Sequence, residues 1–188
     1  MSTKNKIMLL IGIVLAVIII IVLVPKGGQS GQYDQFAQTL KSDGANFYGA
    51  FWCPHCQAEK KLFGSSAEYL PYVECSKPDG STQTQICIDK KIEGYPSWTF
   101  KDGITLTSDK TPTICEKSPG VKGEPSVCGN VSSKYNRVWV FPDYAFSIKS
   151  PADPVKQGTT WKFPPEAMVS GEIPLSFLAQ QINFVLPQ

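Results

Sequence analysis

The chain contains one histidine, His55, and no second C-x-x-C beside the one formed by Cys53 and Cys56. Structural zinc sites combine two such pairs, or one pair with two histidines, so the sequence disfavours zinc and predicts no metal site. Attachment of a c-type haem needs a histidine directly after the second cysteine, and Gln57 stands there instead. The sequence therefore favours another role for the cysteine pair.

An excess of one charge is also lacking, since 18 lysines and arginines face 16 aspartates and glutamates and leave a net charge of +2. The lysines are dispersed, and no basic run occurs outside the short N-terminus. Such a distribution disfavours nucleic acid as a partner. With four Trp, seven Tyr and ten Phe among 188 residues, the chain has the length and apolar content of a folded domain with a sizeable core.

Long apolar runs are absent except at residues 7–24, which carry no charged side chain. These 18 residues reach the lower end of the length that crosses a bilayer as a helix. A cleaved signal peptide has an apolar region of about 7 to 15 residues and a small-x-small site. No such site follows Val24. We therefore predict an uncleaved, single-pass transmembrane anchor at residues 7–24.

The flanks of this run predict its orientation. Lys4 and Lys6 precede it and favour a cytoplasmic location for residues 1–6. Residues 25–32 are rich in Gly, Gln and Ser and are expected to be a flexible linker, followed by a folded domain at 33–188. All six cysteines lie in that domain, which suits an oxidising compartment. We expect a cytoplasmic-membrane protein with its soluble domain on the extracytoplasmic side.

The chemically informative stretch is residues 46–59, which read N-F-Y-G-A-F-W-C-P-H-C-Q-A-E. The aromatic-rich run that ends at Trp52 predicts a buried strand, and residues 54–63 predict a helix. At a helix N-terminus, unpaired N–H groups and the positive end of the dipole stabilise an anion. Cys53 is therefore expected to be held as a thiolate with a depressed pKa.

Three neighbouring residues complete the candidate catalytic group of Cys53, Cys56, His55 and Pro54. Pro54 suits the first helical position, where its missing N–H costs nothing. Protonated His55 adds a positive charge beside the sulfur, and Cys56 can attack a mixed disulfide formed at Cys53. Stabilising the reduced pair makes its disulfide an oxidant. A purely structural role is disfavoured because a bridge over two residues constrains an unfolded chain little.

The other four cysteines are expected to form structural disulfides. Six cysteines allow fifteen pairings, but proximity in the sequence favours Cys75 with Cys87 and Cys115 with Cys128. Each bridge would close a loop of about a dozen residues and would stabilise the folded state by on the order of 3 kcal/mol in the chain-entropy model. The alternative is that Cys75 and Cys87 relay electrons to the C-x-x-C pair.

Three separated motifs carry a resemblance to a known family: Y-G-A-F-W-C-P-H-C-Q-A-E-K-K-L-F-G, then Y-V-E-C, then I-E-G-Y-P-S-W. They resemble the thioredoxin superfamily, and most closely the thioredoxin-like domain fused to bacterial homologues of vitamin K epoxide reductase. F-W-C-P-H-C is similar to the active-site run of Dsb-type periplasmic disulfide oxidants. The resemblance covers about residues 36–102 and resumes near the C-terminus. It implies an α/β, thioredoxin-like fold, a central mixed sheet flanked by helices.

The resemblance also implies substrate-binding residues. Pro96 would be the cis-proline placed against the C-x-x-C, so that the backbone of Tyr95 faces the sulfurs and pairs with an extended substrate chain. The alternative is a trans-Pro turn before a strand. Many such proteins place a buried acid six positions ahead of the first cysteine, where this chain has Phe47. An acid acting on Cys56 would then be Glu74 or water, or the step runs unaided.

The rest of the domain is predicted in outline. The expected helices are 33–41, 54–63, 82–92 and 170–184, and the expected strands are 45–52, 72–75, 98–100 and 159–163. The helix at 82–92 has Ile86, Ile88 and Ile92 available for burial. Residues 104–160 exceed a simple hairpin loop and are expected to form a disulfide-stapled insert at the domain's edge, serving as a substrate flap or a docking surface.

These observations predict a membrane-anchored thiol-disulfide oxidoreductase that introduces disulfides into secreted proteins, with no cofactor beyond its own redox-active disulfide. Its partners would be protein thiol substrates. The resemblance implies a separate membrane quinone-linked reoxidant of the vitamin K epoxide reductase or DsbB type. The alternatives are a disulfide reductase or isomerase, a thiol factor of cytochrome c maturation, and a non-enzymatic binding module with a structural C-x-x-C.

Overall fold

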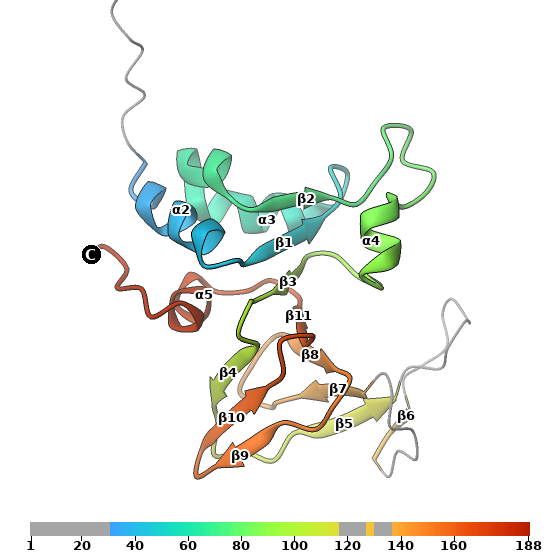
Figure 1. Cartoon of the computed structure of the whole chain (residues 1–188), viewed down its shortest axis with the longest axis vertical. Helices are drawn as coiled ribbons and strands as arrows, with labels where there is room; N and C mark the ends of the chain where they lie inside the picture. The colour runs from blue at the N-terminus through green and yellow to red at the C-terminus, as the bar shows by residue number, and fades with distance from the viewer. Residues whose placement is uncertain (1–30, 117–126, 130–136) are drawn as a thin grey trace, which may run out of the picture. The chain divides into compact units, whose positions relative to one another are not determined.

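The computed structural model describes residues 31–116, 127–129 and 137–188, drawn in colour in Figure 1. Residues 32–188 form one compact unit. The anchor predicted at residues 7–24 lies outside the described residues. Within the described ranges, every helix is too short or too polar to cross a membrane.

A mixed α/β core surrounds the C-x-x-C segment. Strand β1 pairs parallel to β2 and antiparallel to β3, and β3 pairs antiparallel to β11. This arrangement is compatible with a thioredoxin-like fold. The elements of the core are α2 (Asp34–Ser42), β1 (Asn46–Gly49), α3 (Pro54–Phe63), the 3₁₀ helix η1 (Gly64–Tyr69), β2 (Tyr72–Glu74), α4 (Gln85–Asp89), β3 (Ser97–Thr99), β11 (Met168–Ser170) and α5 (Leu175–Gln181).

The bounds of α3 follow from its sequence and confirm the predicted helix at 54–63. Pro54 occupies the first helical position, where no N–H is needed. Lys60 and Lys61 lie in the last turn, where positive charge suits the helix dipole. Gly64 ends the helix with a φ of 58°, a conformation that glycine adopts without a steric penalty.

Two other helices are shorter than predicted. Helix α4 spans five residues, and of its side chains Cys87 is buried while Ile86 and Ile88 are half exposed. The prediction that all three isoleucines are available for burial is therefore wrong for these two, because neighbours of a buried helical residue face away from it. Helix α5 begins only after Pro174, since Ser170 pairs with β3 as part of β11.

The insert extends the sheet. Its strands are β4 (Ile104–Thr107), β5 (Thr113–Glu116), β6 (Val127–Cys128), β7 (Arg137–Val140), β8 (Ser147–Ser150), β9 (Val155–Gln157) and β10 (Thr160–Phe163). All lie in sequence between β3 and β11, which are themselves partners. Four of them continue the main sheet, in the order β2-β1-β3-β11-β8-β7-β5-β6. These four insert strands therefore continue the main sheet beyond β11 as hydrogen-bonded strands, and the expected role of the insert as a substrate flap or docking surface stays a prediction.

The strand predicted at 159–163 is present as β10 but belongs to another sheet. It pairs with β4 and β9 in a three-stranded sheet rather than with the central strands. The reason is packing: the Trp161 ring contacts Phe141 at a centroid distance of 5.3 Å, and Phe163 contacts Trp139 at 5.8 Å. β10 thus buries its aromatic face within the insert.

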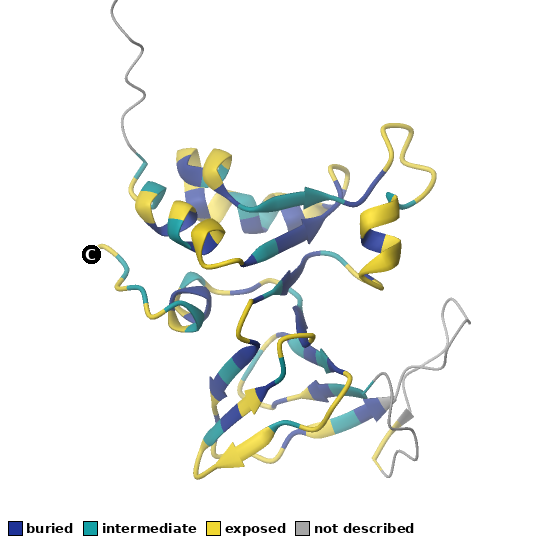
Figure 2. Ribbon diagram, in the orientation of Figure 1, coloured by how far each residue is buried: buried dark blue, intermediate teal, exposed yellow. Residues whose placement is uncertain are grey.

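One contiguous cluster of buried side chains joins both parts, and its blue stretches can be followed in Figure 2. On the core side, Phe47 stacks on Trp98 at 4.7 Å, and Phe36 of α2 stacks on Phe63 of α3 at 5.6 Å. Burying a large apolar side chain contributes about 1.5 to 3 kcal/mol. These contacts fix α3, and with it the C-x-x-C, against the sheet.

Candidate redox-active site

The two thiols lie at the junction of β1 and α3. Cys53 is the N-cap residue of α3, with extended backbone, and its N–H donates to the carbonyl of Ala50 at 3.0 Å. Cys53 is 5% exposed and Cys56 is fully buried. Both are free thiols in this structure. The two thiols therefore lie at the first turn of the helix, where unpaired backbone N–H groups are found.

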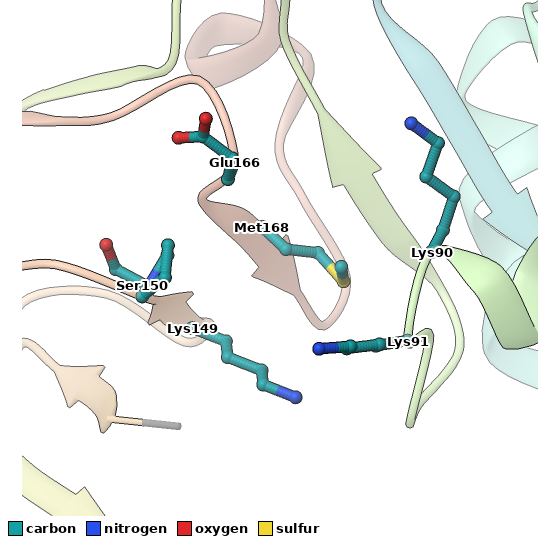
Figure 3. A pocket seen from close by; sticks show the side chains of 7 residues that line it. Lys90, Lys91, Lys149, Ser150, Glu166 and Met168 are labelled. Carbon is teal, nitrogen blue, oxygen red and sulfur yellow. The ribbon is translucent and has the colours of Figure 1, made fainter. Parts of the chain in front are cut away.

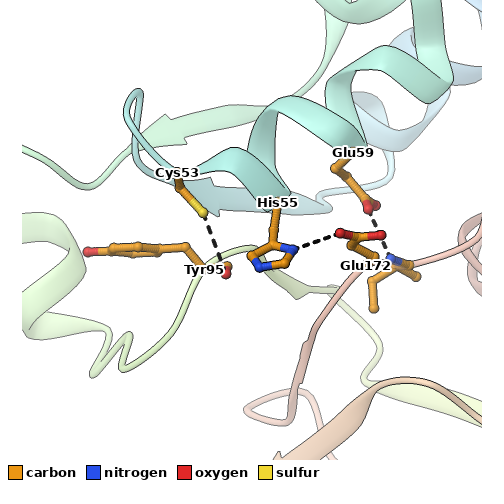
Figure 4. A network of polar contacts seen from close by, with 6 residues as sticks. Cys53, His55, Glu59, Tyr95 and Glu172 are labelled. Carbon is orange, nitrogen blue, oxygen red and sulfur yellow. Dashed lines mark hydrogen bonds and ion pairs between the residues drawn. The ribbon is translucent and has the colours of Figure 1, made fainter. Parts of the chain in front are cut away.

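The segment before β3 meets the first thiol. The Tyr95–Pro96 peptide bond is cis, and the Cys53 thiol donates to the Tyr95 carbonyl oxygen with an Sγ···O distance of 3.7 Å (Figure 4). The Tyr95 ring also meets the edge of the Trp52 ring at 6.0 Å. The structure therefore brings Cys53 together with Tyr95 and Pro96, which follow it in the sequence by about forty residues.

Cys56 lies in a tightly enclosed space below Cys53. A Cβ built on Gly49 would stand 2.9 Å from the Cys56 sulfur and 2.8 Å from Cε2 of Tyr72, so the glycine leaves room for both. Burial raises the pKa of Cys56 to about 12, while a backbone hydrogen bond at Ala50 and the charge of Lys60 oppose this rise. Cys56 is thus a protonated, sheltered thiol.

His55 lies at the open surface of the helix start. Its Nδ1 is 2.7 Å from a carboxylate oxygen of Glu172, in the loop between β11 and α5 (Figure 4). Both side chains are more than half exposed, so the ion pair contributes little to stability. Sequence reasoning did not identify Glu172, because 117 residues separate it from His55 and no local pattern marks it.

Glu59 is a second acidic residue that sequence reasoning did not identify. It is fully buried on α3, and one carboxylate oxygen accepts a hydrogen bond from the Ile173 N–H at 2.9 Å (Figure 4). Burial raises the pKa of Glu59 to about 7, while the hydrogen bond from Ile173 and the Trp98 side chain oppose the rise. Its spacing of three residues from Cys56 was the available signal, since such residues share a helix face.

Glu74, the acid that the sequence suggested for Cys56, is fully engaged elsewhere. One carboxylate oxygen accepts from the N–H groups of Phe51 and Ser76, at 3.2 and 2.9 Å. The other accepts from the Tyr72 hydroxyl at 3.0 Å. Glu74 therefore fixes the turn that leads into Cys53 and reaches the second thiol only through Tyr72.

A cavity of about 470 Å³ flanks the first thiol. Its walls include the Trp52 and Tyr95 rings, with Ser76 and Gln83 between them. These groups are held in place, because the Trp52 indole N–H donates to Ser76 Oγ at 2.8 Å and Gln83 Nε2 donates to the Tyr95 hydroxyl at 2.6 Å. The cavity thus has rigid aromatic walls next to Cys53.

Another cavity, of about 430 Å³, lies between the end of α4 and strands β8 and β11. Figure 3 shows Lys91 and Lys149 extending toward it, with Met168 on its wall. None of the site residues predicted from the sequence lines it. Across the described ranges, His, Cys, Asp and Glu form no group of three or more that could hold a metal ion.

The remaining cysteines are paired. Cys75 bonds to Cys87, linking the end of β2 to α4, and Cys115 bonds to Cys128 across the β5–β6 pair. Cys75 also lines the cavity beside Trp52. Their role as structural staples, rather than as a relay to the C-x-x-C, stays a prediction.

Comparison with known proteins gives partial matches. No protein-family model matches the chain. A 73-residue alignment is 48% identical to the thiol-disulfide oxidoreductase LTO1 of Arabidopsis thaliana and covers 36% of this chain. An 82-residue alignment is 32% identical to a thioredoxin domain-containing protein 5 homologue of Drosophila melanogaster and covers 37% of this chain. Each alignment spans 19% of the relative's length. Together with the fold, these similarities support a thioredoxin-like superfamily for this chain.

Proposed function

We propose that this chain is a membrane-anchored thiol-disulfide oxidoreductase that introduces disulfides into proteins outside the cytoplasm. One observation carries the reaction class: Cys53 is the N-cap residue of α3, its thiol lies 3.7 Å from the Tyr95 carbonyl oxygen, and Cys56 is fully buried three residues on. A thiol in this setting is activated, and a second thiol one turn away can exchange with it. The similarity to the thiol-disulfide oxidoreductase LTO1 and to a thioredoxin domain-containing protein supports the same class.

The reaction would run by two exchanges. A substrate thiolate attacks Sγ of Cys53 in the Cys53–Cys56 disulfide; a substrate–Cys53 bond forms and Cys56 leaves as a thiolate. A second substrate thiolate then attacks the substrate sulfur, and Cys53 leaves as a thiolate. The substrate loses two electrons and two protons, and the C-x-x-C pair takes up both. Pro54 starts the helix, and protonated His55 adds positive charge near the leaving Cys53 sulfur.

The substrate would lie as an extended chain along Tyr95 and Pro96. The backbone at Tyr95 offers it hydrogen-bonding groups, in the manner of an added strand. Phe51 and Trp52 expose large apolar surfaces next to Cys53. The cavity behind Trp52 has room for one apolar or aromatic side chain next to the substrate cysteine.

The oxidising direction and the membrane context belong to the proposal. The Pro-His pair between the cysteines and the apolar run at residues 7–24 support them. The redox-active disulfide would be the only cofactor. Reoxidation would come from a separate membrane quinone-linked enzyme of the vitamin K epoxide reductase or DsbB type.

The test is a redox titration of the full-length chain in detergent against glutathione, with alkylation of each cysteine followed by mass. We expect Cys53 and Cys56 to titrate together above about −200 mV while the other cysteines stay oxidised. A potential near or below about −270 mV would make the chain a reductant. No titration of this pair would leave a binding module with structural cysteines.

Trapping variants test the roles of the two thiols. Cys56→Ser should accumulate mixed disulfides with substrate proteins, because the second thiol can no longer displace the substrate from Cys53. Cys53→Ser should abolish turnover. The control is the double variant Cys75→Ser, Cys87→Ser, which removes a disulfide without touching the pair. Equal trapping by this control would contradict the assignment.

A further inference from the structure

The buried thiol raises a physical problem, which rests on the function proposed above. Cys56 must carry a negative charge whenever it leaves or attacks Cys53, yet it is fully buried and its pKa is raised to about 12. Cys56 is the third residue of α3, and burial outweighs the effect of the helix dipole there, since the pKa of its thiol is raised. Phe47 stands six residues ahead of Cys53 and carries no charge. The buried acid Glu59 on α3 accepts a hydrogen bond from Ile173 and supplies no positive charge. Another group must stabilise the Cys56 thiolate.

Tyr72 is the neighbour of Cys56 on the sheet side. Both side chains border the space that Gly49 leaves open, at 2.8 and 2.9 Å from its built Cβ. The Tyr72 hydroxyl donates to Glu74 at 3.0 Å, which fixes the ring against β1. Burial together with Glu74 raises the pKa of Tyr72 far above its ordinary value, so Tyr72 stays neutral. It fills the space beside the sulfur but supplies no charge.

Lys60 supplies the charge. It follows Cys56 by four residues on α3 and therefore lies on the same face of the helix. Its Nζ stands over the Tyr72 ring, 3.3 Å from the centroid, and this cation–π contact fixes the ammonium on a ring that borders the same space as the Cys56 sulfur. Burial lowers the pKa of Lys60, whereas the charges of Glu74 and Cys56 raise it. Lys61, the next residue, is exposed.

We propose that Lys60, held over the Tyr72 ring, is a positioning residue whose charge stabilises the Cys56 thiolate during exchange with Cys53. In the resolving direction, Cys56 loses its proton to water, its thiolate attacks Sγ of Cys53, and the Cys53–Cys56 bond forms. The bond between Cys53 and the substrate breaks, and the substrate leaves as a thiolate. In the oxidising direction, the same charge stabilises Cys56 as it leaves.

The experiment isolates this step. The full-length chain in detergent is glutathionylated at Cys53, and the release of glutathione by Cys56 is followed from pH 5 to 9. Lys60→Met removes the charge and keeps an unbranched side chain. Lys60→Arg keeps both the positive charge and the contact with the Tyr72 ring. Lys61→Met is the matched control. Attack of Cys53 on oxidised glutathione is measured in parallel.

We expect Lys60→Met to slow glutathione release at pH 7 about threefold to tenfold and to move the midpoint of its pH profile to higher pH. Lys60→Arg should restore the wild-type midpoint, because arginine also stacks on aromatic rings. Lys61→Met and the Cys53 reaction should be unchanged.

Three results would overturn the inference: an unchanged profile in Lys60→Met, an equal shift in Lys61→Met, or slower release without a shift in pH. If wild type released no glutathione, the proposed function itself would fail.

Discussion

At the scale of single residues, Gly49 decides how closely the sheet approaches the second thiol. Gly49→Ala would add a Cβ within 3 Å of both the fully buried Cys56 and the Tyr72 ring. Lys60 and Glu74 hold that ring in place. We expect this overpacking to lower the free energy of unfolding by about 1 to 3 kcal/mol, measured by urea denaturation.

The matched control is Gly94→Ala. A Cβ at Gly94 meets no atom within 4 Å, so its unfolding free energy should stay close to that of wild type. Equal loss in the two variants would mean that the crowding at Gly49 is not the cause. The strand predicted at 45–52 is shorter in the structure, where β1 spans Asn46–Gly49.

The sequence predicts residues that act through local pattern and misses those that act through long-range contact. Cys53 and Cys56 follow from their spacing at a helix start, and Lys60 could have been noted from its spacing of four. The partners Glu172 and Tyr72 could not, because each meets the site only after the sheet brings distant segments together. Glu59 was missed because an acid on a polar-looking helix is normally exposed.

At the scale of elements, Glu59 joins α3 to the loop before α5. Burial raises the pKa of this carboxyl from 4.5 to about 7 in the folded chain, so the folded state binds the proton more tightly than the unfolded chain. Stability should therefore fall as pH rises from 4.5 to 7, by roughly 3 kcal/mol once the carboxyl is fully ionised.

Glu59→Gln tests this link, since the amide stays neutral and can still accept a hydrogen bond from Ile173. Between pH 5 and 7.5, the unfolding free energy of this variant should decrease much less than that of wild type. Glu166→Gln, at an exposed position, is the control and should keep the wild-type slope. A slope that survives in Glu59→Gln would assign the pH dependence to other groups.

Element bounds were predicted best where capping residues are explicit. Helix α3 has proline at its start and glycine at its end, and its predicted bounds agree with the structure. Helix α4 has no such signals, and the disulfide at Cys87, rather than an apolar stripe, fixes it to the sheet. Tertiary context therefore overrode the helical periodicity at Ile86 and Ile88.

At the scale of the whole molecule, the insert and the core share one β-sheet and one cluster of buried hydrophobic residues. The sequence indicated its length but not its pairing, because strands such as β8 are short and find their partner β11 from a distant part of the chain. Register between such strands depends on long-range contacts that no local pattern encodes. For this reason the sequence did not predict that insert strands continue the sheet beyond β11.

This architecture predicts that the insert stabilises the fold without tuning the redox pair. The disulfide between Cys115 and Cys128 joins β5 to β6, at the end of the sheet farthest in strand order from β1 and β2. It closes a loop with a sequence separation of 13, worth about 3 kcal/mol in the chain-entropy model. The double variant Cys115→Ser, Cys128→Ser should lose up to that amount of unfolding free energy.

The reduction potential of Cys53 and Cys56 in that double variant should match wild type, because strands β8 and β7 separate the lost disulfide from the core strands. Both quantities are measured on one preparation, by urea denaturation and by glutathione titration. The Cys75→Ser, Cys87→Ser variant provides the contrast, since Cys75 lines the cavity next to Trp52. If only the Cys115→Ser, Cys128→Ser variant shifted the reduction potential, the insert would act on the redox site. The continuous sheet would then be the physical connection between them.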